Sequence, residues 1–460
     1  MVLFVLGGAA VAQADEAKRV YEQLCASCHG ADLSGGKGPS LLGDLKLGDD
    51  ASSLAHAIKA GFPNTGMPPA GSQLGDADIA ALVVYLTERR INQIEPGPAA
   101  PLDQQLVRES EKSKYRIEAI INEGLQIPWS FDWLPDGRLL LTERIGRLRV
   151  IQDGKLLPDP VADIPAVIER GEGGLMAVAV SPTYAQDGWI YLSFSDPGEG
   201  EHAMTKIVRG KLRDHRFTDQ ETIFAIPKEQ YQEGYVLFGS RLQFDRGYLF
   251  FTIGERGQTG DAQKLEVPNG KVHRVWPDGR TPSDNPFADT PGAWGSIWSY
   301  GHRNPQGLAI NPTTHEVWES EHGPRGGDEV NFIRAGKNYG WPVITYGMNY
   351  EGTPVSDRTA APGMEQPARY WTPSIAVSPI AFYTGDKFPG WKNNLFVGSL
   401  AQQKFIRFEV DGGKLVHQEE LFSKLGRVRD IKTGPDGYLY VAFEELHGAS
   451  GWLVRIVPAN

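Results

Sequence analysis

The stretch FDWLPDGRL at residues 131–139 places a Pro-Asp-Gly turn between two apolar segments, and IKTGPDGYL at residues 431–439 repeats this pattern. A turn of this chemistry between apolar segments predicts two adjacent antiparallel strands. Four related stretches lie between them: VAVSP (178–182), LQFDRGYL (242–249), LAINP (308–312) and PGWKNNLF (389–396). The chain after residue 115 therefore contains six similar units, spaced by about 45 to 80 residues.

One such unit cannot bury both faces of its strands, so six units that close into a ring are the expected architecture. The alternative is a sandwich with coincidental hairpins. The 54 glycines and 32 prolines agree with many short strands joined by sharp turns. We predict a multidomain protein, in which a small all-α domain precedes an all-β six-bladed propeller at residues 115–460. Long loops between blades should gather around the axis and form a ligand site.

The chain has only two cysteines, Cys25 and Cys28, and both lie in the pentapeptide CASCH that ends at His29. This pentapeptide is the c-type heme attachment motif, in which two thiols bond covalently to heme c and the histidine becomes an axial iron ligand. The alternative is a redox or disulfide cysteine pair.

The surroundings of CASCH fit a heme domain. A short amphipathic helix is predicted at residues 16–24, and Met67 lies on a Gly/Pro-rich loop where its thioether suits the second axial position. A closing helix is predicted from Asp76 to Leu86. This order resembles a class I cytochrome c over about residues 16–90, with GPSL (38–41) as the loop that supports the axial histidine. The alternative for Met67 is a plain core residue.

Two segments frame this domain. Residues 2–14 form an apolar run that ends in Ala-Gln-Ala, which predicts a signal peptide at residues 1–14 and a periplasmic location; the alternative is a helix of the mature fold. The Pro-rich stretch IEPGPAAP (94–101) predicts a linker at residues 93–114, after a cytochrome domain at residues 15–92. Nothing later in the chain is long and apolar enough to predict a membrane span.

The formal net charge of −11 and the pI near 5.5 argue against nucleic acid or an anionic membrane surface as a partner. A small neutral ligand, such as a sugar or an alcohol, remains compatible with this charge.

Five further segments are more specific than the repeated turns: WSYGHRNPQG (298–307), ESEHGPRGGDE (319–329), GKNYGWP (336–342), PSIA (373–376) and GRVRD (426–430). In this order they closely resemble the soluble glucose/aldose (glucose/sorbosone) dehydrogenases, over about residues 118–456. The resemblance implies pyrroloquinoline quinone (PQQ) and Ca²⁺ as cofactors. A flat tricarboxylate such as PQQ needs guanidinium groups for its carboxylates and a divalent cation for its quinone.

The resemblance also implies roles for individual residues. Arg303 would be catalytic and would bind the cofactor, and backbone carbonyls of Gly323 and Pro324 would bind the Ca²⁺ that bridges to PQQ. Glu329 and Tyr339 match positions that bind a second, structural Ca²⁺. The remaining cofactor-binding positions are Glu172, Asn304, His322, Asp328, Ser374, Arg427 and Arg429.

Three positions depart from the family pattern. Leu237 stands where relatives have the histidine that takes the substrate proton, and the loss of such a base costs about 10²–10⁴ in rate. Glu172 replaces a usual glutamine, and Ala401 replaces a usual lysine. Strand alternation should point Lys404 to the opposite face. His273 is one alternative base.

Three functions follow from this pattern. The first is an oxidoreductase that oxidises a sugar or alcohol at PQQ and passes electrons through its own heme to a periplasmic acceptor, with the fusion shortening the electron path. The second is a propeller that has lost this chemistry and binds a ligand or partner beside an electron-transfer heme. The third is an enzyme with a changed substrate or quinone and another base.

Overall fold

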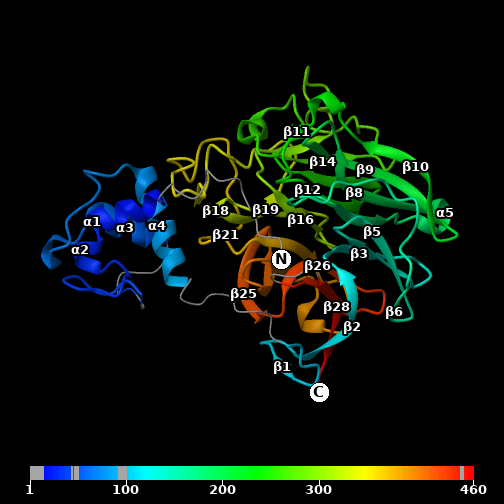
Figure 1. Ribbon diagram of the computed structural model, residues 1–460, viewed down its shortest axis with the longest axis horizontal. Coiled ribbons are helices and arrows are strands. Elements are labelled where there is room, and N and C mark those ends of the chain that lie inside the picture. Colours follow the sequence, from blue (N-terminus) through cyan, green and yellow to red (C-terminus); the bar gives the residue numbers. More distant parts are fainter. Residues whose placement is uncertain (1–14, 43–44, 46–50, 92–100, 446–449, 460) are drawn as a thin grey trace.

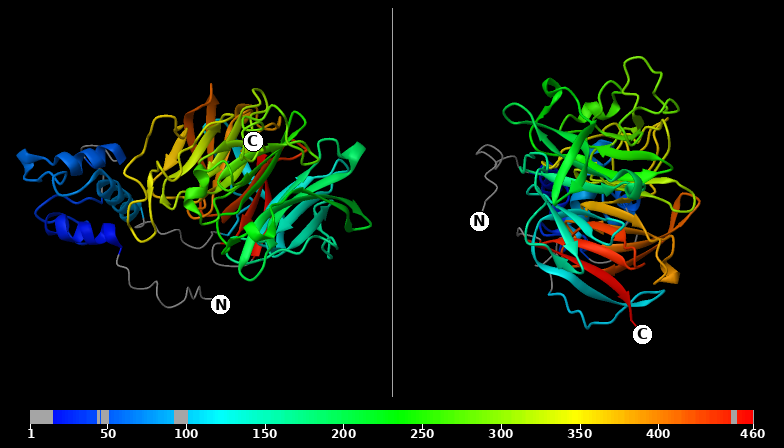
Figure 2. Two further views of the ribbon diagram at one scale, coloured as in Figure 1. Left: turned by 90° about the horizontal axis from the view of Figure 1, so that it is seen from above. Right: turned by 90° about the vertical axis from the view of Figure 1, so that its right-hand side faces the viewer.

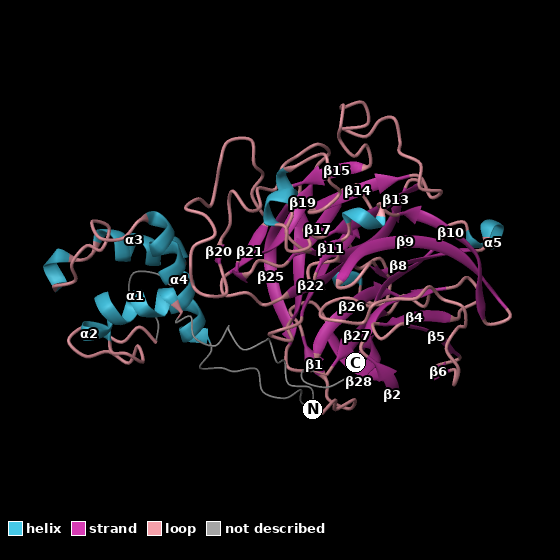
Figure 3. Cartoon of the chain, turned by 45° about the horizontal axis from the view of Figure 1, so that its top comes forward, coloured by secondary structure: helices cyan, strands magenta, loops and turns pink. Residues whose placement is uncertain are grey.

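The structure is a computed structural model, and it describes residues 15–42, 45, 51–91, 101–445 and 450–459. The predicted signal peptide and residues 93–100 of the predicted linker lie outside the described residues. Helices form the N-terminal domain and strands the remainder, as Figure 3 shows by colour. The predicted fold class, a small α domain before a six-bladed β-propeller, is confirmed.

Four helices build the N-terminal domain: α1 (Glu16–Leu24), α2 (Ala26–His29), α3 (Ala51–Ala60) and α4 (Asp76–Ile91), with a 3-10 turn η1 (Pro63–Thr65). Asp15 caps α1, because its carboxylate accepts the Lys18 N–H at 3.1 Å. The helices at residues 16–24 and from Asp76 agree with the sequence prediction, whereas α3 was not predicted. Within the described residues, no helix combines the length and the apolarity needed to cross a membrane.

Six antiparallel sheets form the propeller (Figure 1). Blade 1 contains β3 (Pro128–Trp133), β4 (Leu139–Glu143), β5 (Arg147–Gln152) and β6 (Lys155–Leu156). Blade 2 contains β7 (Leu175–Val180), β8 (Trp189–Pro197), β9 (His202–Arg213) and β10 (Arg216–Phe224), with β11 (Gln232–Glu233) beside β9. Blade 3 contains β12 (Gly239–Asp245), β13 (Tyr248–Ile253), β14 (Lys271–Val275) and β15 (Ile297–Tyr300).

The other three blades follow the same plan. Blade 4 contains β16 (Pro305–Ile310), β17 (Val317–Glu321), β19 (Asp328–Ile333) and β21 (Arg369–Trp371), and its loops pair β18 (Arg325–Gly326) with β20 (Gly347–Met348). Blade 5 contains β22 (Val377–Phe382), β23 (Leu395–Ser399), β24 (Phe405–Asp411) and β25 (Lys414–Phe422). Blade 6 contains β26 (Arg427–Thr433), β27 (Leu439–Glu444), β28 (Ser450–Pro458), β2 (Lys114–Gln126) and β1 (Arg108–Glu109).

Blade 6 joins both ends of the propeller, because β2 pairs with the C-terminal strand β28. Strand β1 pairs with β2, so residues 108–109, inside the predicted linker, already belong to this sheet. The six repeated sequence units all fall at the connection between the first and second strands of a blade. Short helical turns occupy propeller loops: α5 (Tyr184–Asp187), η2 (Lys228–Gln230), η3 (Thr259–Gln263) and η4 (Pro389–Trp391).

The first strands β3, β7, β12, β16, β22 and β26 are the inner strands, and each contacts the inner strands of both neighbouring blades. A buried arginine, Arg241, ties several of them together. Its guanidinium bonds Asp430 on β26 at 3.0 Å and the Gln306 carbonyl on β16 at 2.7 Å, and it lies 4.2 Å from the ring centre of Trp129 on β3. Apolar clusters fill the spaces between blades.

The helical domain docks on the loops of blade 4 (Figures 1 and 2). Arg325 on β18 bonds Asp15 at 2.8 Å and Glu88 of α4 at 2.6 Å; we name these three residues the Arg325 clamp. The Glu16 N–H donates to the Glu351 carbonyl at 3.0 Å. Met348 on β20 is buried in the apolar core of the helical domain.

Candidate functional site

The heme attachment motif lies where α1 ends and α2 begins. Cys25 and Cys28 are free and partly buried, and His29 is buried with its Nδ1 atom 2.8 Å from the Pro39 carbonyl. That hydrogen bond leaves Nε2 for an iron atom, as a supported axial ligand requires. Gly38 lies against the imidazole, where an added Cβ would come within 3.0 Å of His29 Cε1. These residues therefore fit heme c. Met67, partly buried, pairs with Phe62 in an isolated bridge.

The predicted propeller residues lie near the starts of the inner strands. Glu172 precedes β7, Leu237 precedes β12, Arg303 and Asn304 precede β16, and Ser374 precedes β22. Arg427 and Arg429 lie on β26, where alternate residues point to the same face. The fold therefore assembles the candidate site from five blades at one end of the ring.

Three arginines converge beside His322. Burial and then the positive charges of Arg303, Arg429 and Arg427 lower the pKa of His322 to about 3. The imidazole is therefore neutral, and its Nε2 has no hydrogen-bond partner among the described residues. Arg427 and Arg429 share one carboxylate, Glu444. The site consequently keeps an excess of positive charge.

The turn Gly323–Pro324 lies beside these arginines. Arg303 Nη1 donates to the carbonyls of His322 at 3.0 Å and Gly323 at 2.8 Å. Asp328 is fully buried and holds the turn from behind, since it accepts hydrogen bonds from Gly323 N at 3.0 Å, Ser374 Oγ at 2.7 Å and Val377 N at 3.0 Å. Burial raises the pKa of Asp328 to about 6. Asp328 therefore holds the Gly323–Pro324 turn in place, and Ser374 in turn holds Asp328. The oxygens of both side chains are used in hydrogen bonds within the protein.

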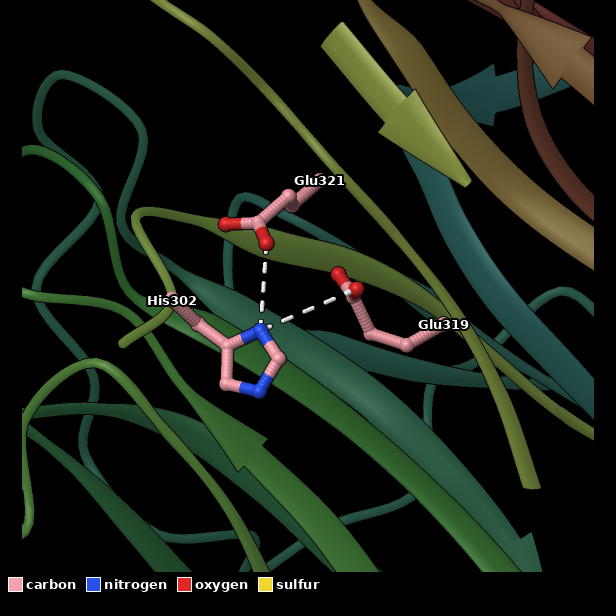
Figure 4. Close-up of side chains that lie close together, drawn as sticks. All are labelled: His302, Glu319 and Glu321. Carbon is pink, nitrogen blue, oxygen red and sulfur yellow. Dashed lines mark hydrogen bonds and ion pairs between the residues drawn. The ribbon is translucent and has the colours of Figure 1, made fainter. Parts of the chain in front are cut away.

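A buried acidic group surrounds His302 (Figure 4) and lies behind Arg303, whose N–H donates to Glu321 Oε2 at 2.5 Å. Glu321 Oε1 lies 3.1 Å from His302 Nδ1, and Glu319 Oε2 lies 3.9 Å from the same nitrogen. Asn331 Nδ2 donates to Glu319, Glu321 and Glu329 at 3.1 to 3.2 Å. Burial, and then the charge of Glu321, raises the pKa of both Glu319 and Glu329 well above the usual range.

This acidic group fits a hard divalent cation. Glu319 and Glu321 are buried and have only His302 as a basic group within ion-pair distance in the described chain, and Glu329 is joined to them through Asn331. Glu319 Oε1 and Asn331 Oδ1 are buried without a partner there. A cavity of about 10 Å³, enough for one water or ion, is lined by Glu321, Gly323, Glu329, Tyr339 and five other residues besides Arg303. The ring of Tyr339 stacks on His302.

A larger cleft, of about 360 Å³, lies elsewhere. It is on the outer strands of blade 2 and is lined by Phe194, Asp196, Lys206, Glu221 and seven other residues. None of the converging arginines lines it. We place the functional site at the axis because charge and unpartnered groups converge there, whereas in the cleft Lys206 pairs with Asp196 at 3.6 Å and Glu221 with Arg209 at 2.6 Å.

Two of the departures from the family pattern meet in space. The Glu172 carboxylate accepts the Leu237 N–H at 2.8 Å and lies 3.5 Å from Asn304 Nδ2. Asn304 Oδ1 accepts the Gly239 N–H at 3.1 Å. Leu237 is buried and has a φ of +55°, a conformation that costs a leucine about 1–2 kcal/mol. The site therefore imposes this backbone geometry on position 237.

The remaining candidates lie apart from the arginines. Lys404 pairs with Glu420 on the outer strand β25 at 3.0 Å, so it does not replace the cation absent at Ala401. His273 is fully buried and both ring nitrogens are engaged, by Ser296 at 3.0 Å and the Pro268 carbonyl at 2.9 Å. Burial lowers the pKa of His273 to about 3. His273 therefore has no access to a substrate.

Sequence reasoning missed several charged residues of the site. Arg144 acts on Arg427 and Glu444, and Arg256 is buried beside Glu172. Burial raises the pKa of Glu255 to about 7, and its N–H bonds the Arg303 carbonyl at 2.8 Å. Glu255 and Arg256 both lie in the sequence motif GERG (254–257), which is the only local signal for them. Their partners come from other blades, so the sequence did not reveal these contacts.

Fold and site together define a propeller with a cationic axial pocket, fused to a cytochrome c domain. Residues 125–455 match the Glucose / Sorbosone dehydrogenase family, and residues 12–86 match the family described as Cytochrome C oxidase, cbb3-type, subunit III. The chain therefore belongs to the glucose/sorbosone dehydrogenase family and carries a cytochrome c domain.

Relatives agree with this assignment. The aldose sugar dehydrogenase YliI of Escherichia coli is 44% identical over 349 residues, which cover 74% of this chain and 92% of that protein. The apo-form crystal structure of the soluble E. coli aldose sugar dehydrogenase matches with a TM-score of 0.70 and 42% identity over 75% of this chain and all of that chain. A PQQ-bound aldose sugar dehydrogenase from Streptomyces coelicolor matches with a TM-score of 0.62 and 26% identity, covering 76% and 99%.

Proposed function

We propose that this protein is a periplasmic quinoprotein that oxidises a sugar or related alcohol with PQQ and Ca²⁺ and passes the electrons to its own heme c. One observation carries the proposal: Arg303, Arg427 and Arg429, from two blades, converge with excess positive charge beside the Gly323–Pro324 turn. A flat tricarboxylate is the kind of ligand that such a pocket neutralises.

When bound, PQQ would supply the two-electron oxidant. The residues of this chain would hold and orient it. The guanidinium groups of Arg427 and Arg429 suit carboxylates, and neutral His322 adds no charge of its own. Asp328 accepts the Gly323 N–H and so holds the turn, and the Gly323 carbonyl still has a lone pair available for Ca²⁺ beside its bond from Arg303. Arg303 hydrogen-bonds this turn directly, which supports its catalytic assignment.

We assign a second Ca²⁺ to the acidic group behind Arg303, with Glu329 and Tyr339 beside the ion-sized cavity. A cation there would neutralise carboxylates that are otherwise buried without a counter-charge. The ion would act on the stability of blade 4.

Transfer of electrons to the heme is supported by the domain contact. Arg325, the central residue of the Arg325 clamp, directly follows Pro324. The next residue, Gly326, packs against Val84 of α4, because a Cβ added to Gly326 would lie 3.4 Å from Val84 Cγ1. Val84 and Met348 belong to the apolar cluster against which Cys25 also packs. A continuous path of packed residues therefore links the Gly323–Pro324 turn to the heme attachment motif. Each substrate yields two electrons, so the heme iron must pass one electron twice to the external acceptor.

The heme itself reports the test. Heme-loaded protein is supplied with PQQ and Ca²⁺ and then with a panel of aldoses and alcohols, while the reduced-heme absorption band is followed. Reduction that requires both PQQ and a substrate supports the proposal. Absence of reduction with PQQ bound would contradict it.

The second candidate is a propeller that binds a ligand or partner beside an electron-transfer heme without oxidising it. Leu237 favours it, because leucine cannot take a proton. This candidate predicts no PQQ-dependent heme reduction with any substrate, so the same experiment separates the two.

A further inference from the structure

The loop before β7 brings a carboxylate to the position that lacks its base. Glu172 lies in an exposed turn. The Glu172 N–H donates to the Tyr235 carbonyl at 2.8 Å, and this bond fixes the turn against the segment that precedes β12. Its Oε2 atom then accepts the Leu237 N–H at 2.8 Å. A carboxylate therefore lies within one hydrogen bond of the backbone where a histidine base is missing.

Glu172 is exposed and lies near a buried positive charge. Arg256 lies close enough for its positive charge to act on Glu172, and it is buried with Nε and Nη1 unpartnered in the described structure. Burial lowers the pKa of Arg256 to about 10, so it stays cationic at neutral pH. Asn304, a predicted cofactor contact, lies 3.5 Å from the same carboxylate oxygen. Glu172 is exposed, so a substrate can approach and a proton can leave to water.

The other titratable side chains at the axis are hydrogen-bonded, buried or surrounded by like charge; Glu255, whose Oε2 has no partner among the described residues, is only 2% exposed. Both Asp328 oxygens accept hydrogen bonds from the protein. His322 lies among three arginines that oppose its protonation, and Glu444 is shared by Arg427 and Arg429. Glu172 is thus the carboxylate that combines access, a nearby cation and contact with position 237.

We propose that Glu172 is the general base of this protein, in place of the histidine that relatives have at position 237; this inference rests on the proposed function. The substrate hydroxyl gives its proton to a Glu172 carboxylate oxygen, and the hydrogen on the same carbon leaves with two electrons for the bound quinone. The C–O bond becomes C=O, and the proton passes from Glu172 to water. The two departures, Glu172 and Leu237, are then one compensated change.

The test is Glu172→Gln in heme-loaded full-length protein, with PQQ affinity and heme reduction measured on the same sample. Loss of a base lowers the substrate-driven rate of heme reduction by about 10²-fold or more. PQQ should bind as tightly as before or more tightly, because one negative charge near an anionic cofactor is removed. A merely structural role would instead weaken binding along with the rate. Glu201→Gln, which neutralises an exposed acid of the neighbouring loop, is the matched control and should change neither quantity.

A second variant, Glu172→Gln with Leu237→His, restores the usual pair and should recover most of the lost rate. If Glu172→Gln binds PQQ and reduces heme at the wild-type rate, the inference is overturned while the proposed function stands. If the wild-type protein binds PQQ but only Leu237→His oxidises sugars, Glu172 is not a base and the pocket assignment survives. If no PQQ binds at all, both fail.

Discussion

Two neighbouring regions carry opposite charge: the axial pocket in front of Arg303 (the front face) and the acidic group behind Arg303 (the rear face). In the front face, Arg427 and Arg429 of blade 6 share one carboxylate, Glu444, and Arg303 has no ion pair in the described chain. In the rear face, Glu319 and Glu321 lie within ion-pair distance of His302, and Glu329 is joined to them through Asn331. Buried charges of one sign are costly unless a counter-charge joins them. The difference supports the proposal that two kinds of ligand complete this region, an anion in front and a cation behind.

The contrast with the Arg325 clamp strengthens this interpretation. Arg325 follows Pro324 directly, yet it has two carboxylate partners from the helical domain. An arginine that the chain itself can neutralise is therefore paired. The arginines of the axial pocket remain in excess where a cofactor is expected.

The front face gives the largest expected effect. Arg429→Leu removes one guanidinium, and since hydrogen bonds to charged groups are worth about 1.5–3 kcal/mol, the dissociation constant of PQQ should rise by roughly 100-fold. A spectroscopic titration of PQQ measures it. Arg455→Leu removes an arginine paired with Glu118 on the outer strands and serves as the control. Equal affinity of Arg429→Leu and wild type would exclude Arg429 from the pocket.

The rear face should respond to chelation. Removal of Ca²⁺ held at about 100 times its dissociation constant costs about 2.7 kcal/mol of folding free energy, so the melting temperature should fall by several degrees. Differential scanning calorimetry with and without a chelator measures the shift. The double variant Glu319→Gln with Glu321→Gln should lose this response. A wild-type protein whose melting temperature ignores both Ca²⁺ and chelator would contradict the cation site.

A charge reversal at the domain contact should have a smaller effect. Glu88→Arg places two cations together in the Arg325 clamp, so the docked state becomes less populated and heme reduction slows about tenfold, as the local concentration of the heme falls. Reduction of an artificial dye directly from the propeller should not change. Glu22→Arg, on the exposed side of α1, is the matched control. Unchanged heme reduction in Glu88→Arg, with amide exchange of residues 347–348 accelerated, would show that the contact is not the electron route.

The smallest effect concerns pH. Glu255 releases its proton near pH 7 in the folded chain and near 4.5 in its unperturbed state, because burial raises its pKa more than Arg303 and Arg256 lower it. Its contribution to stability is therefore complete below about pH 4.5 and is lost as the pH rises through about 7. Glu255→Gln should flatten the fall in melting temperature across this range by a few degrees. Parallel curves for variant and wild type would refute this.

Local patterns predicted the fold well. Each blade begins with a hairpin whose turn residues are contiguous, and CASCH places three expected heme contacts within five residues. Helix α3 was not predicted, although its buried residues Leu54 and Ile58 lie four positions apart, as on one face of a helix. The grouping of the site arginines followed from the family resemblance, since Arg303 and Arg429 are 126 positions apart in the printed sequence.

Long-range partners were beyond the sequence. Glu172 and Leu237 looked like two separate losses, and only the fold shows that they share a hydrogen bond across 65 positions. The Arg325–Glu88 contact spans 237 positions and two domains, with no local signal. The acidic group behind Arg303 depends on adjacent strands β17 and β19, whose register places Glu321 opposite Glu329.

The most direct measurement is an equilibrium titration of heme-loaded wild-type protein with PQQ in the presence of Ca²⁺, followed by absorbance. The converging arginines predict saturable binding of one PQQ per chain. Replacement of Arg303, Arg427 or Arg429 should weaken this binding. Titration to excess PQQ without saturable uptake would contradict the assignment of the axial pocket.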